Sequence, residues 1–166
     1  MTNSAQSTEH ADVLVVGGGG AGLTASMLLA RLGIDHLLVS ALPATSVLPK
    51  AHVLNQRTME ILDDAGCAAE IERRSTPPEN MAATAFYAGL AGSTADHGRL
   101  IAKLECWGNG GDDGHWRSAS AWHQLNLPQI RLEPVMKAQA ETLSPGRIRF
   151  GHELTGLDRT TTALVL

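Results

Sequence analysis

The stretch DVLVVGGGGAGLTASMLLARLG, residues 12–33, decides the fold predicted for this chain. Residues 12–16 form a short apolar run, typical of a strand buried on both faces in a parallel sheet. The apolar residues behind the glycines recur at helical spacing, and Gly33 follows as a helix C-cap. Residues 36–40 (HLLVS) predict a second strand. Together these segments form a β–α–β unit of about thirty residues, the size expected for a crossover between parallel strands.

The glycines between the first strand and the helix match the spacing of a dinucleotide-binding turn, Gly17-x-Gly19-x-x-Gly22. Gly17 allows the tight turn, Gly19 lets a pyrophosphate approach the backbone, and Gly22 lets the helix pack close to the strand. The N–H groups at the start of the helix, on residues such as Gly20 and Ala21, then face the phosphates at the positive end of the helix dipole. These five residues are predicted to bind the cofactor.

The end of the second strand departs from the dinucleotide-binding pattern. The position at which an acid would bond a ribose hydroxyl is occupied by Ser40, while Asp35 precedes the strand. A serine hydroxyl can still bond ribose, so Ser40 is included among the predicted cofactor contacts. No arginine follows at once, so a 2′-phosphate is not indicated.

The remainder of the chain predicts further α/β structure. Asn55 is expected to cap a helix that runs to about Asp64 and ends at Gly66. The other expected elements are a short helix at 68–74, strands at 84–88 and 100–104, a Gly-rich loop at 107–126, a helix at 129–143, a third parallel strand at 148–150 and the start of a hairpin at 153–166. The predicted fold class is therefore α/β, Rossmann-like, with a parallel sheet and the start of a β-hairpin.

Length and composition are ordinary for one globular domain. The chain has 166 residues, 43% of them hydrophobic, with 13 Lys and Arg against 17 Asp and Glu, a formal charge of −4. This balance argues against nucleic acid and against an anionic membrane surface as partners. Cys67 and Cys106 form neither a disulfide framework nor a zinc cluster and are expected to be reduced thiols. No signal peptide or membrane span is predicted, which favours a cytoplasmic protein.

The stretch KAHVLNQRTME, residues 50–60, resembles the segment after the second strand in class A flavoprotein monooxygenases. This is the family of p-hydroxybenzoate hydroxylase and phenol hydroxylase, and the likeness is strongest to its dichlorophenol-hydroxylating branch. Residues 90–92 with 106–109 and residues 127–134 (LPQIRLEP) add further matches. The resemblance extends from Asp12 to about Phe150, nearly the whole chain.

This resemblance implies FAD as the cofactor, with its ADP half on the β–α–β unit, and NADPH as the co-substrate that reduces it. Oxygen then serves to hydroxylate a phenolic ring. The resemblance also implies that Lys50 contacts the FAD pyrophosphate, where many relatives carry an arginine, and that Gln129 lies along the flavin. The family also has two later motifs, one with an Asp-Gly pair and one with a Gly-Asp pair, and both are expected to lie beyond the end of this sequence.

Other residues are weaker candidates for a role at the site. His52, Gln56 and Arg57 are candidates to face the cofactor or substrate, with a surface or capping role as the alternative. The tryptophans are candidates to line an aromatic pocket, with packing as the alternative: Trp107, Trp116 and Trp122. The histidines at 115 and 123 lack the spacing of metal ligands, so no metal site is predicted, and no catalytic residue is named.

The domain organisation expected from the sequence is a disordered leader at 1–11 and one incomplete FAD-binding domain at 12–166. The chain ends in an apolar strand, ALVL at 163–166, which predicts a truncated chain, because an uncharged exposed edge is rare. The sequence leaves two alternatives open. One is a non-catalytic nucleotide-binding module that pairs with a partner chain or a second copy, and the other is part of an NAD-dependent dehydrogenase.

Overall fold

The computed structural model describes residues 9–105, 114–159 and 164–165. It divides into two compact units: residues 1–48 together with 133–166, and residues 49–132. The predicted leader lies mostly outside the described residues, as does Cys106.

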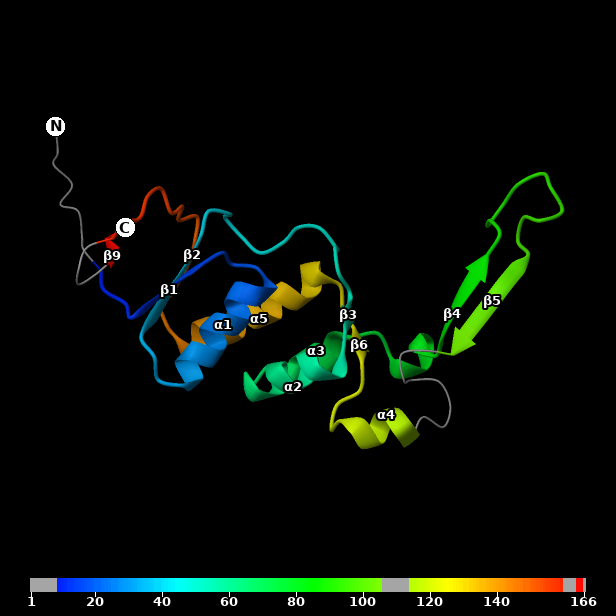
Figure 1. The fold of residues 1–166 in the computed structure, drawn as a ribbon, viewed down its shortest axis with the longest axis horizontal. Helices are drawn as coiled ribbons and strands as arrows, with labels where there is room; N and C mark the ends of the chain where they lie inside the picture. The colour runs from blue at the N-terminus through cyan, green and yellow to red at the C-terminus, as the bar shows by residue number, and fades with distance from the viewer. Residues whose placement is uncertain (1–8, 106–113, 160–163, 166) are drawn as a thin grey trace. The chain divides into compact units, whose positions relative to one another are not determined.

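The first unit is built on a three-stranded parallel sheet (Figure 1). Strand β2 (His36–Ser40) lies between β1 (Val13–Val16) and β7 (Ile148–Phe150), with Val13 opposite His36 and Leu38 opposite Ile148. Helix α1 (Gly20–Arg31) connects β1 to β2 and packs on both strands. The α/β prediction and all three parallel strands are confirmed.

Helix α1 ends as its sequence predicts. Gly33 has a φ of +71°, in the left-handed region that favours glycine. Its N–H donates to the carbonyl of Ala30, and the N–H of Ile34 donates to that of Leu29. These two bonds define a Schellman motif, which satisfies carbonyls that the helix leaves without partners.

The expectation that the first strand is buried on both faces is wrong for the described part of the chain. All five residues of β2 are buried, but β1 is only half-buried, and Val16 is 56% exposed. The reason is strand order: β2 is the central strand, whereas β1 lies at one edge of the three-stranded sheet. The apolar run of β1 indicated burial but did not indicate its place in the sheet.

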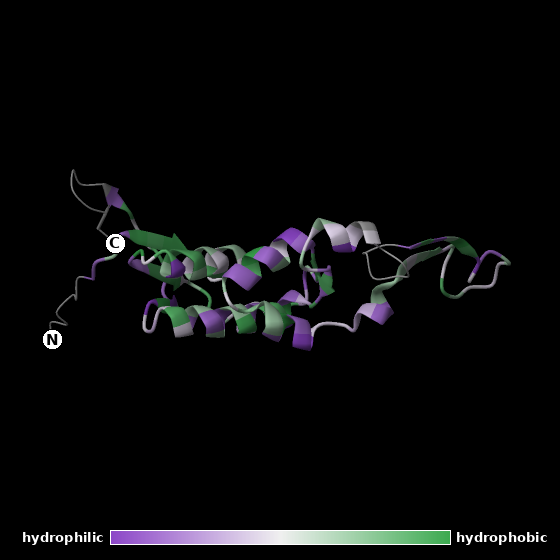
Figure 2. Ribbon diagram, turned by 90° about the horizontal axis from the view of Figure 1, so that it is seen from below, coloured by the Kyte–Doolittle hydropathy of each residue, from purple (hydrophilic) through white to green (hydrophobic). Residues whose placement is uncertain are grey.

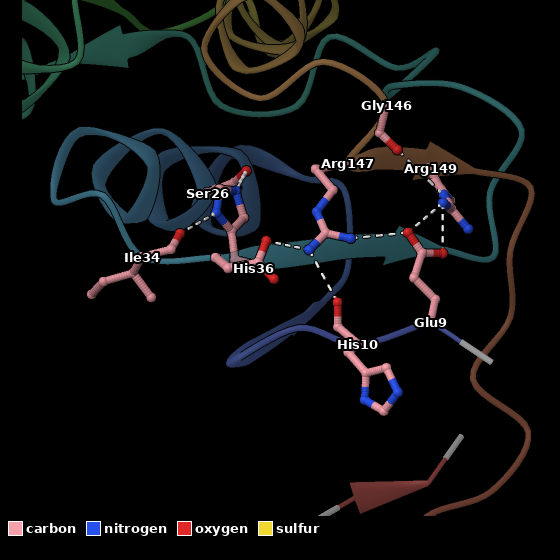
Figure 3. Close-up of polar contacts among 9 residues, drawn as sticks. Glu9, His10, Ser26, Ile34, His36, Gly146, Arg147 and Arg149 are labelled. Carbon is pink, nitrogen blue, oxygen red and sulfur yellow. Dashed lines mark hydrogen bonds and ion pairs between the residues drawn. The ribbon is translucent and has the colours of Figure 1, made fainter.

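Two polar clusters hold this sheet in place (Figure 3). His36 is buried, and its Nε2 lies 2.6 Å from the hydroxyl of the buried Ser26 on α1. Arg147, just before β7, pairs with Glu9 at 2.9 Å and with Asp35. The pKa of Arg147 is raised, mainly by the hydrogen bond to Asp35 and to a lesser degree by the interaction with Glu9. The first cluster fixes α1 against β2, and the second ties the start of the chain to the sheet.

The second unit contains α2 (Gln56–Asp64) and α3 (Ala68–Arg74), which pack against each other. Its strands form two antiparallel pairs, β3 (Val53–Leu54) with β6 (Leu125–Asn126) and β4 (Ala83–Tyr87) with β5 (Leu100–Glu105). A short 3₁₀ helix covers Pro78–Met81. The buried apolar residues of the second unit include Met59, Leu62, Ala65, Ile71, Leu125 and Leu127. The predicted helices and the predicted strands at 84–88 and 100–104 are confirmed, and the structure adds that these two strands pair antiparallel.

The prediction of a loop over residues 107–126 is wrong in part. Within the described residues this stretch contains helix α4 (Gly114–Ala119) and strand β6. The glycines and polar residues favour a loop, but tertiary contacts with α2 and β3 stabilise both short elements. Local propensity is a weak guide for elements this short, because their stability comes from packing.

Helix α5 (Gln129–Leu143) has the predicted bounds and carries Pro134 in its interior. The helix begins in the second unit and continues into the first. Strands β8 (Asp158–Arg159) and β9 (Leu164–Val165) pair antiparallel, as the predicted hairpin requires. Hydrophobic and hydrophilic residues both occur along each long helix (Figure 2), and no helix in the described ranges has the length and apolarity to cross a membrane.

The cap of α2 gives a direct test of this local structure. The Asn55 side chain accepts a 2.8 Å hydrogen bond from the N–H of Thr58. We expect Asn55→Ala to lower the free energy of unfolding by about 1 kcal/mol, because that N–H loses its acceptor. Asn55→Asp keeps an acceptor oxygen and serves as the control. Equal urea midpoints for the two variants would contradict the capping role.

The Cys67 thiol is predicted to be unreactive. It is buried and 3.5 Å from the carbonyl of Leu62, and burial raises its pKa to about 11. Because the thiolate is the nucleophile, native protein carrying Cys106→Ser should react with a thiol reagent at pH 8 far more slowly than unfolded protein. Equal rates in urea and in buffer would show that the site opens freely.

Candidate cofactor-binding site

The turn between β1 and α1 has the conformation that its glycines predict. Gly17 has a φ of +114°, which side-chain-bearing residues rarely adopt. Its N–H donates a 2.8 Å hydrogen bond to the carbonyl of Val39 in β2. The turn is therefore anchored to the central strand at the point where the backbone leaves β1.

Gly22 is required by a close backbone approach. A Cβ built on Gly22 would lie 1.9 Å from the carbonyl oxygen of Gly17 and 3.4 Å from Cγ1 of Val15. Backbone atoms cannot give way to such a contact without moving α1 away from β1. The predicted role of Gly22, to let the helix approach the strand, thus has a specific atomic cause.

The exposed side of the turn fits a phosphate group. Gly19 is the N-cap of α1, and the N–H groups of Gly19 to Gly22 have no acceptor within the helix. Gly19 and Ala21 are exposed, and a Cβ on Gly19 would meet only a Glu133 oxygen at 3.5 Å. Open backbone donors at the positive end of a helix are the features that bind a pyrophosphate.

Gly18 is a closely packed glycine that the fingerprint does not include. A Cβ on Gly18 would lie 2.5 Å from Cζ of Phe150 and 3.0 Å from Cβ of Ser40. Phe150, at the end of β7, thus closes over the buried side of the turn. The run of four glycines was a signal in the sequence, but the side chain that packs against the extra glycine comes from a strand more than a hundred residues away.

Ser40 lies at the carboxyl end of β2, directly beside this turn. It is buried at 5% exposure, and its carbonyl accepts a 2.9 Å hydrogen bond from the N–H of His152. This is the strand end where the predicted ribose contact belongs. That contact by the Ser40 hydroxyl stays a prediction.

A buried carboxylate lies against the turn and was not predicted. Glu133 of α5 is 2% exposed. One of its oxygens accepts a 3.2 Å hydrogen bond from the Gly20 N–H, and the other accepts a 2.7 Å bond from the Ser46 N–H. The sequence signal was its place in the stretch LPQIRLEP, but the spacing gave no indication of this contact.

In the second unit the structure brings Lys50 and Gln129 together. The Gln129 N–H is shared between the carbonyls of Pro49, at 3.0 Å, and Ala51, at 2.9 Å, on either side of Lys50. Lys50 is exposed and has a φ of +41°, the one positive φ outside glycine in the described residues. A non-glycine residue held in the left-handed region marks a segment whose conformation the surroundings impose, often at functional sites.

The weaker candidates have structural partners. The Gln56 amide donates to the carbonyls of Trp116, at 2.8 Å, and Trp122, at 2.9 Å. Gln56 therefore fixes the α4 segment to α2. His52 Nδ1 lies 3.0 Å from Asn126 Oδ1, and Arg57 forms an exposed ion pair with Glu60.

The remaining residues considered from the sequence are tryptophans and histidines. Trp107 lies outside the described residues, and the indole of Trp116 is 40% exposed. Nε2 of His123 lies 3.7 Å from Oε1 of Glu72. Within the described ranges no group of three His, Cys, Asp or Glu residues is arranged to hold a metal ion.

The parallel sheet and the glycine turn at the N-terminus of α1 define a Rossmann-like dinucleotide-binding protein. The chain belongs to the FAD-binding domain family, whose model matches residues 10–164.

Relatives of this chain include monooxygenases and hydroxylases. It is 36% identical over 154 residues to 2,4-dichlorophenol 6-monooxygenase of Delftia acidovorans, covering 92% of this chain and 25% of that protein. It is 55% identical over 146 residues to aklavinone 12-hydroxylase DnrF of Streptomyces peucetius, covering 87% and 28%. The predicted resemblance to class A flavoprotein monooxygenases is confirmed.

Among solved structures, the flavin-dependent monooxygenase PieE in complex with FAD and substrate matches with a TM-score of 0.81 and 41% identity. That match covers 93% of this chain and 26% of PieE. The chain thus spans about a quarter of the length of the proteins it matches.

The glycine turn predicts opposite effects for two similar substitutions. Gly22→Ala should displace α1 and lower the thermal midpoint by many degrees, because its Cβ meets the Gly17 carbonyl. Gly20→Ala should be neutral or slightly stabilising, because a Cβ there meets nothing within 4 Å and alanine favours a helix. Similar melting curves for the two variants would show that the close approach is not a constraint.

Proposed function

We propose that this chain is the FAD-anchoring part of a flavoprotein monooxygenase that hydroxylates a phenolic aromatic ring with NADPH and O2. The observation that carries the proposal is the glycine turn, with the exposed residues Gly19 and Ala21 at the start of α1. The family match supports FAD as the dinucleotide. The phenolic substrate and NADPH come from the resemblance of residues 50–60 and 127–134.

The residues of this chain would bind and orient the cofactor. The N–H groups of Gly19, Ala21 and Gly22 would hold the pyrophosphate, since that of Gly20 is bonded to Glu133, and the Ser40 hydroxyl would bond the ribose. Lys50 would add a positive charge to the pyrophosphate, acting as a point charge where arginine would be bidentate. Gln129 would lie along the flavin. Bound flavin would supply the redox chemistry with oxygen, and the protein would provide position and electrostatics.

The names of the relatives bear on the substrate class. One is named for a dichlorophenol and another for aklavinone, so the names of related chains indicate more than one substrate. We propose a phenolic ring as the shared feature.

The alternatives differ in a measurable way. A dehydrogenase fragment would bind NAD in preference to FAD, whereas the FAD-anchoring proposal requires the reverse. A non-catalytic module would bind the nucleotide but would form part of no hydroxylase. The family match and the lack of an acid at position 40 both argue against the dehydrogenase.

Titration of the 166-residue chain with FAD, followed by flavin fluorescence and absorbance, tests the proposal. We expect saturable binding of FAD and much weaker binding of NAD+. Binding of NAD+ in preference to FAD would overturn the proposal in favour of the dehydrogenase. Absence of FAD binding by a chain with a folded circular-dichroism spectrum would also overturn autonomous FAD anchoring.

Lys50 gives a sharper test of the binding site. Lys50→Asn removes the charge but tolerates the positive φ, so we expect unchanged or slightly higher stability. FAD affinity should fall about tenfold, the loss expected for one charge-assisted contact to phosphate. Lys103→Asn, an exposed lysine on β5, changes the net charge equally and serves as the control. Equal affinities of the two variants would exclude a specific phosphate contact by Lys50.

A further inference from the structure

Glu133 is the charged residue that the proposed binding scheme does not use. It lies on α5 and is buried, and it belongs to the first unit, as do the two half-buried residues that it bonds, Gly20 and Ser46. Gly20 belongs to the phosphate-binding turn, and Ser46 belongs to the segment after β2 that leads along the chain to Lys50. One carboxylate therefore joins two backbone segments that are 26 positions apart, 46 − 20.

Burial of a carboxylate is costly unless hydrogen bonds and positive charge compensate it. Two backbone N–H groups and the positive end of the α1 dipole contribute to this compensation. Because each oxygen accepts from a different segment, the rigid carboxylate plane fixes the spacing between those segments. A neutral amide cannot replace it, because its nitrogen would face one of the two N–H donors.

The side from which Glu133 approaches also matters. Gly20 is half-buried and bonded to the carboxylate, whereas Gly19 and Ala21 on either side of it are exposed. Glu133 thus engages one inward-facing donor of the helix terminus and leaves the exposed neighbours for another anion. Buried at 2% exposure, its oxygens are not placed to contact a ligand in solvent.

We propose that Glu133 is a positioning residue for the dinucleotide pyrophosphate, acting through the backbone of the turn and of residues 41–48 without touching the ligand. The inference rests on the proposed function, since it concerns the same phosphate site. According to this inference, the negative charge of the Glu133 carboxylate favours phosphate binding. Simple Coulomb repulsion would predict the opposite, that removal of this charge strengthens phosphate binding.

The test compares Glu133→Gln with Glu141→Gln, a matched loss of charge on the exposed part of the same helix. Binding of ADP and FAD is measured by calorimetry, and amide hydrogen exchange is measured without ligand. Glu133→Gln should weaken both ligands about tenfold, the effect of one charge-assisted hydrogen bond. Glu141→Gln should bind as the unmodified chain does. Exchange should accelerate at the Gly20 and Ser46 amides while the β2 amides stay protected.

Equal or tighter ADP binding by Glu133→Gln would overturn the inference and would show that the carboxylate only repels phosphate. A uniform rise in exchange over the whole unit would overturn it in favour of a general stabilising role. If the unmodified chain binds neither ADP nor FAD, the proposed function fails. Unchanged exchange at Gly20 and Ser46 in Glu133→Gln would then also overturn the positioning role of Glu133. If Glu133→Gln does not fold, Glu133→Asp, which is too short to reach both donors, provides the same readouts.

Discussion

The close approach of α1 to β1 at Gly22 is the constraint on which the binding site depends. The position of a Gly22 Cβ would be 1.9 Å from the Gly17 carbonyl, so only glycine permits the observed distance. That distance brings the helix N-terminus to the carboxyl end of the parallel strands, where the backbone donors of the turn become exposed. Because the turn is also bonded to Val39, its position follows that of β2, the most completely buried strand.

Several contacts from distant parts of the chain support this turn. Phe150 of β7 closes over Gly18, and Glu133 of α5 accepts from the Gly20 N–H. Neither residue belongs to the fingerprint, yet both act on the same few backbone atoms. The site is therefore a local motif whose geometry depends on a strand and a helix that lie more than a hundred residues later in the sequence.

In the second unit, a contact between distant parts of the chain likewise connects the segment of Lys50 with Gln129. Both were expected to contact the cofactor only because the surrounding residues resemble a family. The structure adds a physical connection, since the Gln129 N–H bonds the carbonyls on both sides of Lys50 and holds the loop where Lys50 has a positive φ. By contrast, the Gln56 amide donates to the backbone carbonyls of Trp116 and Trp122, so Gln56 has a structural role within the second unit.

The sequence by itself determined the β–α–β unit, the helix bounds around Asn55 and Gly66, and the dinucleotide turn, because each depends on local periodicity, capping or glycine conformation. Only the tertiary structure decided that β1 lies at an edge, that α4 and β6 interrupt the Gly-rich stretch, and that Glu133 contacts the turn. Strand order, the stability of very short elements and the partner of a buried carboxylate are all set by contacts between residues far apart in the chain, and spacing along the sequence carries no measure of those contacts.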